Sequence, residues 1–254
     1  MTIVVADPVE SLVLTASGYT LRFVQSQADL ERVQRLRFEV FNLELKEGLA
    51  SAYQTGLDAD AWDDVCTHLL VEHDDTHQVV GTYRMQTGWT AKDALGYYSA
   101  QEFDMCLYAP ERGQILELGR ACISQKHRNI SVLTLLWRGI AAYAKEHGSR
   151  YLLGCSSLTS QSPQEAHDAF MVMQPYLAPE EFRTVPQKGM ACESVARVHN
   201  THYKLPKLLS VYLSLGAWVC GPPAMDTEFK TIDFLTLLDL HSPQMQWQRR
   251  RFGF

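Results

Sequence analysis

The chain has 254 residues, 46% of them hydrophobic and 20% charged, which is typical of a globular protein with a sizeable core. Its formal net charge of −6 argues against nucleic acid as the main partner, because phosphate binding needs a basic surface. Six cysteines without a C-x-x-C pair indicate single thiols in a reducing compartment. The N-terminal segment makes a poor signal peptide and no apolar run reaches the ~20 residues of a membrane span, so we expect a cytoplasmic protein.

The first half of the chain predicts a helix between strands. Residues 19–24 form the first predicted strand, and apolar residues then recur at helical spacing over 29–41. Residues 67–73 and 78–87 flank the turn-like segment DDTH, which indicates an antiparallel hairpin. Residues 99–105 resemble a short capped helix.

The second half alternates further strands and helices. The predicted strands are 115–123, 151–157, 217–221 and 231–240, and the predicted helices are 132–148, 163–173 and 206–215. This order predicts an α/β fold, in which helices cover the faces of a mixed sheet.

The predicted strand ILELGRACI, residues 115–123, carries two charged residues among apolar ones. A buried charge is costly unless it is paired or used, so Glu117 and Arg120 form either a structural ion pair or part of a functional site. Strict alternation would place these side chains on opposite faces of the sheet. Both can line one cleft only if a bulge falls between them, and Gly119 is well placed for it.

Two further arginines and an acidic segment are candidates for binding. Arg84 lies on an apolar-flanked strand, where pairing with a local acid is the simplest interpretation. Arg37 lies in the first predicted helix, where a solvated face is the simplest one. The segment LDADAWDD contains Asp60 and Asp63 and is either a solvated loop or an anionic wall that receives a substrate's ammonium group. The EF-hand pattern is absent, and no metal site is predicted.

Several catalytic signatures are missing from the sequence. Without G-x-S-x-G, Walker A, G-x-G-x-x-G or H-E-x-x-H patterns, the hydrolase, NTPase, dinucleotide and zinc-protease functions lose support. The tail WQRRRFGF, residues 247–254, interleaves arginines with aromatic residues. It is either a frayed terminus or a short contact for an anionic membrane surface or an acidic carrier protein.

Five stretches, taken in order, resemble one family: LRFEVFNLEL, LDADAWDDVCTHLLV, VVGTYRMQT, LELGRACI and LLWRGIAAYAKEHG. They are similar to the ornithine-lipid N-acyltransferases, a group in the GNAT superfamily that is related to the acyl-homoserine-lactone synthases. The resemblance implies a GNAT-like domain over residues 19–240, with a central twisted mixed sheet flanked by helices. An N-terminal extension, 1–18, would precede it, and a basic-aromatic tail, 241–254, would follow.

The resemblance implies an enzyme that transfers a long-chain fatty acyl group from acyl carrier protein to the α-amine of an amino acid. Ornithine is the expected acceptor, and the expected product is lyso-ornithine lipid. No cofactor would be bound, because the donor is the acyl-phosphopantetheine of the carrier protein. The implied partners are this carrier protein, the amino acid and a peripheral contact at the inner membrane, but no nucleic acid.

The resemblance also implies roles for particular residues. Glu117 would be the general base for the acceptor's ammonium group, directly or through water. Arg120 and Arg84 would bind the acceptor's carboxylate or orient the acidic loop. The implied substrate-binding positions on the acceptor side are Arg37, Phe41, Asp60 and Asp63.

The loop before the predicted helix 132–148 departs from the wider superfamily. Acetyl-CoA enzymes usually carry a glycine-rich loop there, whose amides hold a pyrophosphate. This chain has KHRNISVLT, without glycine. That weakens a CoA donor and fits phosphopantetheine on a carrier protein, whose phosphate His127 and Arg128 could meet.

Alternative functions remain open from the sequence. The acceptor could be glycine, lysine or tyrosine, or the chain could be an acyl-homoserine-lactone synthase that requires S-adenosylmethionine. A non-catalytic acyl-carrier or lipid-binding module is the alternative of another class, and it predicts that Glu117 is dispensable.

Overall fold

The computed structural model describes residues 11–193, 200 and 202–252, apart from the side chains of residues 248–252. The strands are β1 (Val13–Ala16), β2 (Tyr19–Phe23), β3 (Thr67–His73), β4 (Val79–Thr87), β5 (Ile115–Ile123), β6 (Tyr151–Leu158), β7 (Trp218–Val219), β8 (Ala224–Asp226) and β9 (Thr231–Asp239). The α-helices are α1 (Gln27–Phe38), α2 (Ala52–Thr55), α3 (Gly88–Asp93), α4 (Ile130–Glu146), α5 (Pro163–Val172), α6 (Lys207–Ser214) and α7 (Pro243–Phe252).

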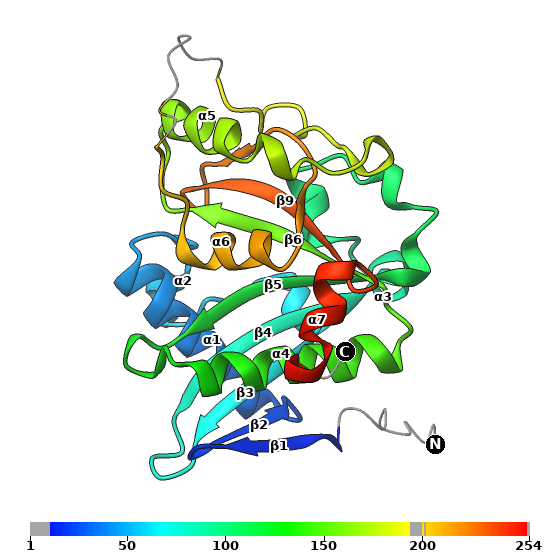
Figure 1. Cartoon of the computed structure of the whole chain (residues 1–254). Helices are drawn as coiled ribbons and strands as arrows, with labels where there is room; N and C mark the ends of the chain where they lie inside the picture. The colour runs from blue at the N-terminus through cyan, green and yellow to red at the C-terminus, as the bar shows by residue number, and fades with distance from the viewer. Residues whose placement is uncertain (1–10, 194–199, 201, 253–254) are drawn as a thin grey trace.

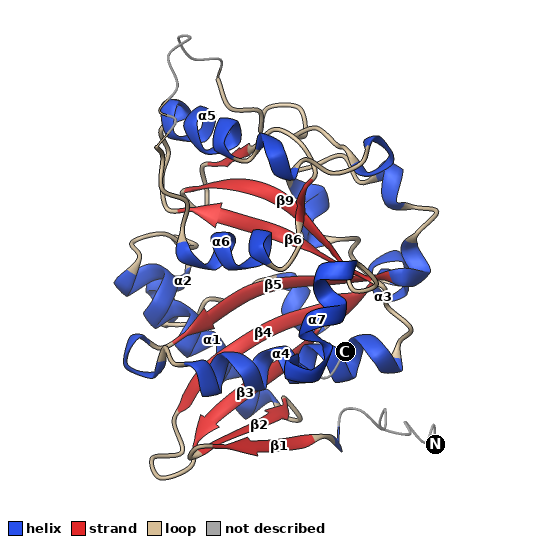
Figure 2. Cartoon of the chain, viewed as in Figure 1, coloured by secondary structure: helices blue, strands red, loops and turns tan. Residues whose placement is uncertain are grey.

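The described strands form one mixed sheet with helices on both of its faces (Figures 1 and 2). Their order is β1-β2-β3-β4-β5-β6-β9-β7, and β8 pairs with β9 outside this path. All neighbouring strands are antiparallel except β5 and β6, which are parallel. The predicted α/β fold with a central mixed sheet is therefore confirmed.

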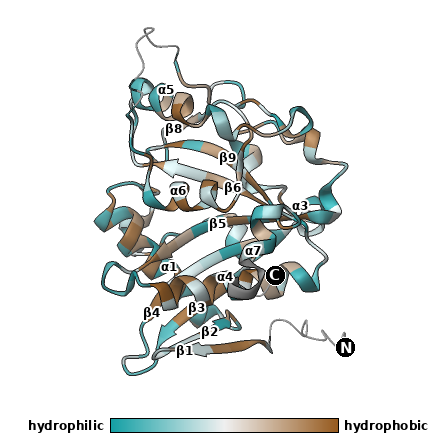
Figure 3. Cartoon of the chain, in the orientation of Figure 1, coloured by the Kyte–Doolittle hydropathy of each residue, from teal (hydrophilic) through white to brown (hydrophobic). Residues whose placement is uncertain are grey.

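The two faces of β4 and β5 differ in chemistry, because side chains alternate along a strand. Tyr83 and Met85 point to the face covered by α4, where they join the largest apolar cluster. Arg84 and Gln86 point to the opposite face, the side of α1. Figure 3 shows the hydrophobic residues of α4 over the central strands. The sheet thus separates an apolar face from a face that carries charged residues.

The sheet opens between β5 and β6. These strands pair only from Ile115 to Glu117 on β5, although both continue for several residues beyond. Figure 1 shows the two strands spreading apart, with α6 in front of the opening. Gly154 lies where they part, and a Cβ there would be 2.2 Å from the carbonyl oxygen of Leu118. Glycine at this position therefore permits the close approach from which the strands diverge.

Most predicted elements are present with small shifts in their ends. The hairpin of β3 and β4 is antiparallel as expected, and β5 has its predicted bounds. The first helix changes after Phe38 into a wider π-helical turn, Glu39–Glu44. The prediction of a short helix at residues 99–105 is wrong, because the chain forms only a 3₁₀ turn at Tyr98–Gln101. There the amides of Tyr98 and Ser99 bind a strand side chain, Glu117, which holds this turn against β5.

Both ends of the described chain contact the domain. Strand β1, which was not predicted, pairs with β2 along its length. Helix α7 packs against α4, and its Met245 is fully buried. The aromatic side chain of Trp247 is 87% exposed, whereas the arginines of the tail lie outside the described side chains. Among the described residues, no helix combines the length and the hydropathy that crossing a membrane requires.

Candidate active site

A cavity of about 1080 Å³ passes through the opening between β5 and β6. Its polar half lies on the α1 face and includes Arg84, Gln86, Glu117 and Arg120. Its apolar half lies on the α4 face, where α4 and α6 contribute side chains. The apolar lining residues include Leu118, Leu133, Leu136, Trp137, Val211, Tyr212 and Leu215. Charged groups and an apolar channel therefore meet where the strands part.

A β-bulge brings Glu117 and Arg120 to the same face of the sheet. Arg84 pairs with Gly119 and Thr82 with Cys122, so two residues of β5 stand opposite Tyr83. Arg120 is one of them and has a left-handed backbone with φ of +49°. This conformation is unfavourable for a side chain other than glycine, and such strain is typical of functional sites. The predicted bulge is confirmed, and it falls one residue after Gly119.

Glu117 is buried in the cavity wall and is surrounded by donors. Its carboxylate accepts hydrogen bonds from the backbone amides of Tyr98 and Ser99, each at 2.8 Å. The side-chain amide of Gln86 donates a third, at 2.5 Å. Because each of these partners is a donor, the position suits an ionised carboxylate. Glu117 and Arg120 do not pair with one another, so the structural ion-pair interpretation is wrong.

Three arginines and three aspartates form one buried network, which we call the arginine–aspartate network. Arg37 binds Asp58 at 2.8 Å and Asp63 at 2.7 Å. Arg84 contacts Asp60 at 2.5 Å and Asp63 at 2.8 Å. Arg120 binds Asp60 at 2.9 Å and lies 3.3 Å from Asp58. Three positive and three negative groups thus balance.

Burial and pairing act against one another in this network. Burial raises the pKa of the Asp63 carboxyl, but the guanidinium groups of Arg37 and Arg84 outweigh it and hold that pKa well below its usual range. The ring of Tyr98 lies 5.0 Å from the guanidinium carbon of both Arg84 and Arg120. The acidic segment is therefore fixed to the sheet.

The simplest sequence interpretations of two features are wrong. Arg37 is not solvated, because its side chain is 0% exposed and surrounded by carboxylates. The acidic segment is not a solvated loop, since Asp58 and Asp63 are buried. Arg84 does pair with local acids, as expected. The carboxylates of Asp60 and Asp63 already have arginine partners, so neither is an unpaired anion.

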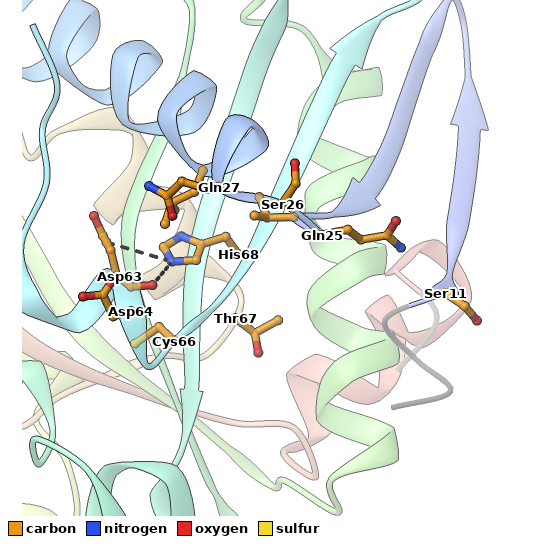
Figure 4. Close-up of a pocket in the computed structure, with 11 residues that line it drawn as sticks. Ser11, Gln25, Ser26, Gln27, Asp63, Asp64, Cys66, Thr67 and His68 are labelled. Carbon is orange, nitrogen blue, oxygen red and sulfur yellow. Dashed lines mark hydrogen bonds and ion pairs between the residues drawn. The ribbon is translucent and has the colours of Figure 1, made fainter. Parts of the chain in front are cut away.

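A second cavity of about 710 Å³ lies behind the acidic segment (Figure 4). His68 lies in its wall, and its Nε2 is 3.2 Å from the carbonyl oxygen of Asp63. Burial lowers the pKa of His68 to about 4, so the ring is neutral near pH 7. This cavity lacks the apolar channel of the larger one, and His68 supports the arginine–aspartate network from behind.

The remaining predicted binding residues occupy different places. Phe41 lines the large cavity and makes an edge-to-face contact with Phe229, with ring centres 5.5 Å apart. Arg128 lies at the same cavity and forms a two-pronged ion pair with Glu44 at 2.6 and 2.8 Å. His127 instead packs against Tyr19, with its Nδ1 3.1 Å from the tyrosine hydroxyl, and does not line the cavity.

The structure also brings together acidic residues that the sequence did not single out. Glu102, Asp226 and Asp233 each offer a carboxylate oxygen, and these atoms lie within 4.8 Å of one another. All three line the polar half of the large cavity. Burial raises the pKa of Glu102 well above its usual value and that of Asp233 to about 6. We call this set the carboxylate cluster.

The signal for the carboxylate cluster was present in one strand only. Asp233 lies in TIDFLTLLDL, an acid within an apolar strand, which is the same pattern that drew attention to Glu117. Glu102 lies in a connecting segment far away in sequence, whereas Asp226 ends the short strand β8, which pairs with β9, and only the fold brings Glu102 to them. Oxygen ligands of this type suit an ammonium group and also a hard divalent cation.

Comparisons with known proteins agree with this geometry. A family model described as an acetyltransferase (GNAT) domain matches residues 36–138. The AHL synthase LasI covers 94% of this chain and 96% of its own, with a TM-score of 0.51 at 13% identity. FeeM, an N-acyl amino acid synthase from uncultured soil microbes, covers 92% and 93%, with a TM-score of 0.52 at 11% identity. At these identities the two structures show the shared fold. The fold and the site define a GNAT-type N-acyltransferase.

Sequence relatives are more specific. The L-ornithine N(alpha)-acyltransferase of Agrobacterium fabrum is 35% identical over 237 residues, covering 87% of this chain and 80% of the relative. The protein of the same name from Brucella abortus is 32% identical, covering 87% and 84%. That of Rhizobium meliloti is 31% identical, covering 93% and 85%. The chain belongs to the L-ornithine N(alpha)-acyltransferase family.

Proposed function

We propose that the enzyme transfers a long-chain fatty acyl group from the phosphopantetheine thioester of acyl carrier protein to the α-amine of ornithine. The acceptor follows the name shared by the relatives at 27–35% identity. One structural observation carries the reaction type: the cavity through the sheet joins a buried carboxylate to an apolar channel. An amine and an acyl chain can meet there from opposite faces.

Glu117 is the proposed general base. An ornithine α-ammonium group must lose a proton before its nitrogen can attack the thioester carbon, and Glu117 accepts that proton directly or through water. The C–N bond forms first and gives a tetrahedral intermediate, whose collapse breaks the C–S bond. The attacking nitrogen loses its second proton in this step, and a proton passes to the leaving thiolate, which departs as the free phosphopantetheine thiol. No acyl-enzyme is needed, because the amine attacks the donor itself.

The oxyanion of the tetrahedral intermediate has backbone donors available in β5. Beyond Glu117, β5 has no ladder partner on the β6 side, so amides on that edge face the cavity. Preorganised amides of this kind stabilise a developing negative charge. We propose that an amide between Ala121 and Ile123 has this role.

The N-terminus of α4 supports a carrier-protein donor. The side chain of Asn129 accepts hydrogen bonds from the amides of Ser131 and Val132, at 3.0 and 3.1 Å. These amides are the groups that would hold a pyrophosphate, and the loop has no glycine to admit one. A phosphopantetheine needs only a single phosphate contact, for which Arg128 at the cavity is the proposed partner.

The arginines act mainly through the acidic segment. Since Arg84 and Arg120 form ion pairs with Asp60 and its neighbours, their first role is to fix the wall of the acceptor site. We propose that Arg120, which lines the cavity, also attracts the carboxylate of the acceptor. Cytoplasmic location and a peripheral membrane contact through the C-terminal tail complete the proposal.

Product mass spectrometry tests this function. The purified enzyme is incubated with long-chain acyl carrier protein and a pool of the twenty amino acids, ornithine and S-adenosylmethionine. We expect one new mass, N-acyl ornithine. A different acylated amine would identify another acceptor for the same reaction. An acyl-homoserine lactone would show that the enzyme is a homoserine-lactone synthase. No product from loaded carrier protein would favour a non-catalytic binding module.

The matched variants are Glu117→Gln and Glu146→Gln. Glu117→Gln keeps the shape of the side chain and removes the base, so kcat should fall by roughly 10²–10⁴-fold. Glu146 is exposed on α4 and far from the cavity lining, so its variant should keep full activity. Unchanged kcat in a folded Glu117→Gln enzyme would remove Glu117 from the mechanism.

A further inference from the structure

We propose that the carboxylate cluster of Glu102, Asp226 and Asp233 binds the side-chain ammonium group of the acceptor and so selects a diamino acid. This inference rests on the proposed function, because it assigns the far end of the same acceptor. The cluster lines the cavity that contains Glu117.

Glu102 is the member that most clearly lacks a partner. Only 3% of Glu102 is exposed to solvent, and the residue lines the cavity. Within the part of the chain that the structure describes, its Oε2 atom has no hydrogen-bond partner. A buried carboxylate oxygen without a donor is costly, so this position favours a ligand that brings a donor.

The other two members are held in place by hydrogen bonds. The hydroxyl groups of Ser157 and Thr231 both donate to Asp233, the latter at 2.6 Å. The amides of Glu228 and Phe229 donate to Oδ1 of Asp226, at 2.9 and 2.8 Å. These contacts orient the carboxylates but bring no positive charge.

The cluster is therefore not balanced electrically. Among the described residues, no lysine, arginine or histidine forms an ion pair with its members. Burial raises the pKa values of Glu102 and Asp233, and the positive charge of Arg120 offsets only part of this effect. The Arg120 guanidinium itself binds Asp60. A fourth acid, Glu47, lines the same cavity, and burial raises its pKa to about 7. A cation in this region would offset the cost of ionising these groups.

The geometry fits an ammonium group. An –NH₃⁺ group has three donors, and three acceptors placed tetrahedrally at ~2.8 Å from its nitrogen lie about 4.6 Å apart. The three carboxylate oxygens lie within 4.8 Å of one another, which accommodates this arrangement. One ammonium nitrogen can thus contact all three members.

The cluster also adjoins the proposed reaction centre. The Ser99 amide donates to Glu117, and the Ser99 hydroxyl is 3.5 Å from the thiol of Cys155. Cys155 in turn lies near enough to Glu102 for the two groups to interact electrostatically, and both line the cavity. One continuous wall therefore joins the base to the cluster, so a single acceptor can present its α-amine to Glu117 and its second amine to Glu102.

Steady-state kinetics with two acceptors test the proposal. Ornithine and norvaline share the same α-amino acid and the same three-carbon side chain, but norvaline lacks the terminal amine. With long-chain acyl carrier protein as donor, we expect the wild-type enzyme to favour ornithine by at least ~10-fold in kcat/KM. Glu102→Gln should lose most of that preference through the KM for ornithine, with norvaline turnover within about twofold of wild type.

Controls separate the outcomes. Glu146→Gln should keep the preference, and Asp226→Asn, at a half-buried position, replaces Glu102→Gln if the latter does not fold. Equal losses for both acceptors, or no preference in the wild type, would overturn the inference. Turnover that is abolished by EDTA and restored by Mg²⁺ or Ca²⁺ would assign the cluster to a metal instead. No acylated product from any amine would refute the proposed function itself.

Discussion

Two groups of buried and half-buried carboxylates line this part of the enzyme and have opposite electrostatics. The aspartates of the arginine–aspartate network have guanidinium partners at 2.5 to 3.3 Å. The carboxylate cluster has no cationic partner within ion-pair distance among the described residues. Accordingly, the pKa of Asp63 is lowered, whereas those of Glu102 and Asp233 are raised.

The difference distinguishes a structural acid from a binding acid. A buried carboxylate with a fixed arginine contributes to positioning, because its charge is already neutralised. One that remains unpaired in a cavity costs stability until a ligand supplies the charge. The sequence suggested the acidic segment as an amine site. Its aspartates instead have a structural role, and the carboxylate cluster is the proposed amine site.

The largest effect is expected from breaking the balanced network. Arg37→Ala leaves Asp58 and Asp63 buried without their fully enclosed partner, so the free energy of unfolding should fall by about 3–5 kcal/mol. Urea unfolding measures it. The control Arg138→Ala changes an exposed arginine of α4 and should stay within about 0.5 kcal/mol. If Arg37→Ala lowered the free energy of unfolding as little as Arg138→Ala does, the network would contribute nothing to stability.

The carboxylate cluster should respond in the opposite direction. Glu102→Gln removes an unpaired buried charge, so the unliganded variant should be more stable than wild type by about 1 kcal/mol at pH 8. Differential scanning calorimetry with Glu146→Gln as control measures the change. A destabilised Glu102→Gln enzyme at that pH would show that the charge is already satisfied within the fold.

The pH dependence of stability should show both regions. Because the folded pKa of Asp63 lies below its unfolded value, its contribution is present above pH ~4 and is lost as the pH falls further. Asp233 and Glu47 have folded pKa values of about 6 and 7, so their ionisation reduces stability as the pH rises from ~4 through those values. The pKa of Glu102 is raised by burial in the same way, so the gain in stability from Glu102→Gln should disappear toward pH 4, where this carboxyl group becomes protonated.

The smallest effect is expected from the thiol of Cys155, which lies beside Ser99 and near the carboxylate cluster. Burial raises the pKa of Cys155 well above its usual value, which keeps it protonated and a poor nucleophile. Cys155→Ala should change kcat by less than about threefold, because the mechanism has no acyl-enzyme. Loss of turnover in a folded variant, together with an acylated Cys155 in the wild type, would restore a thioester intermediate.

Local patterns predicted much of the fold. The turn-like segment DDTH predicted the hairpin of β3 and β4, the aliphatic residues of ILELGRACI predicted the strand β5, and its charged pair indicated a bulge if both side chains were to line one cleft. Helical periodicity predicted α4. Short elements such as β1 and β8 were missed, because they have three or four residues and depend on pairing with a neighbouring strand.

The site was harder to predict because it depends on distant segments. The burial of Arg37 requires the acidic segment to fold over α1, which spacing within the helix cannot show. The carboxylate cluster joins one distant connecting segment to the paired strands β8 and β9, and only one of its three members lies in a conspicuous sequence pattern. Unpaired charge is a property of the whole cavity, so sequence alone could not separate these acids from those of the network.

The position of the new amide bond tests the central claim most directly. If the carboxylate cluster holds the second ammonium group while Glu117 faces the first, tandem mass spectrometry should find only Nα-acyl ornithine from the wild-type enzyme. Glu102→Gln should give less product and some acylation at the side-chain nitrogen. Side-chain acylation by the wild type, or an unchanged yield of pure Nα product from the variant, would contradict this account.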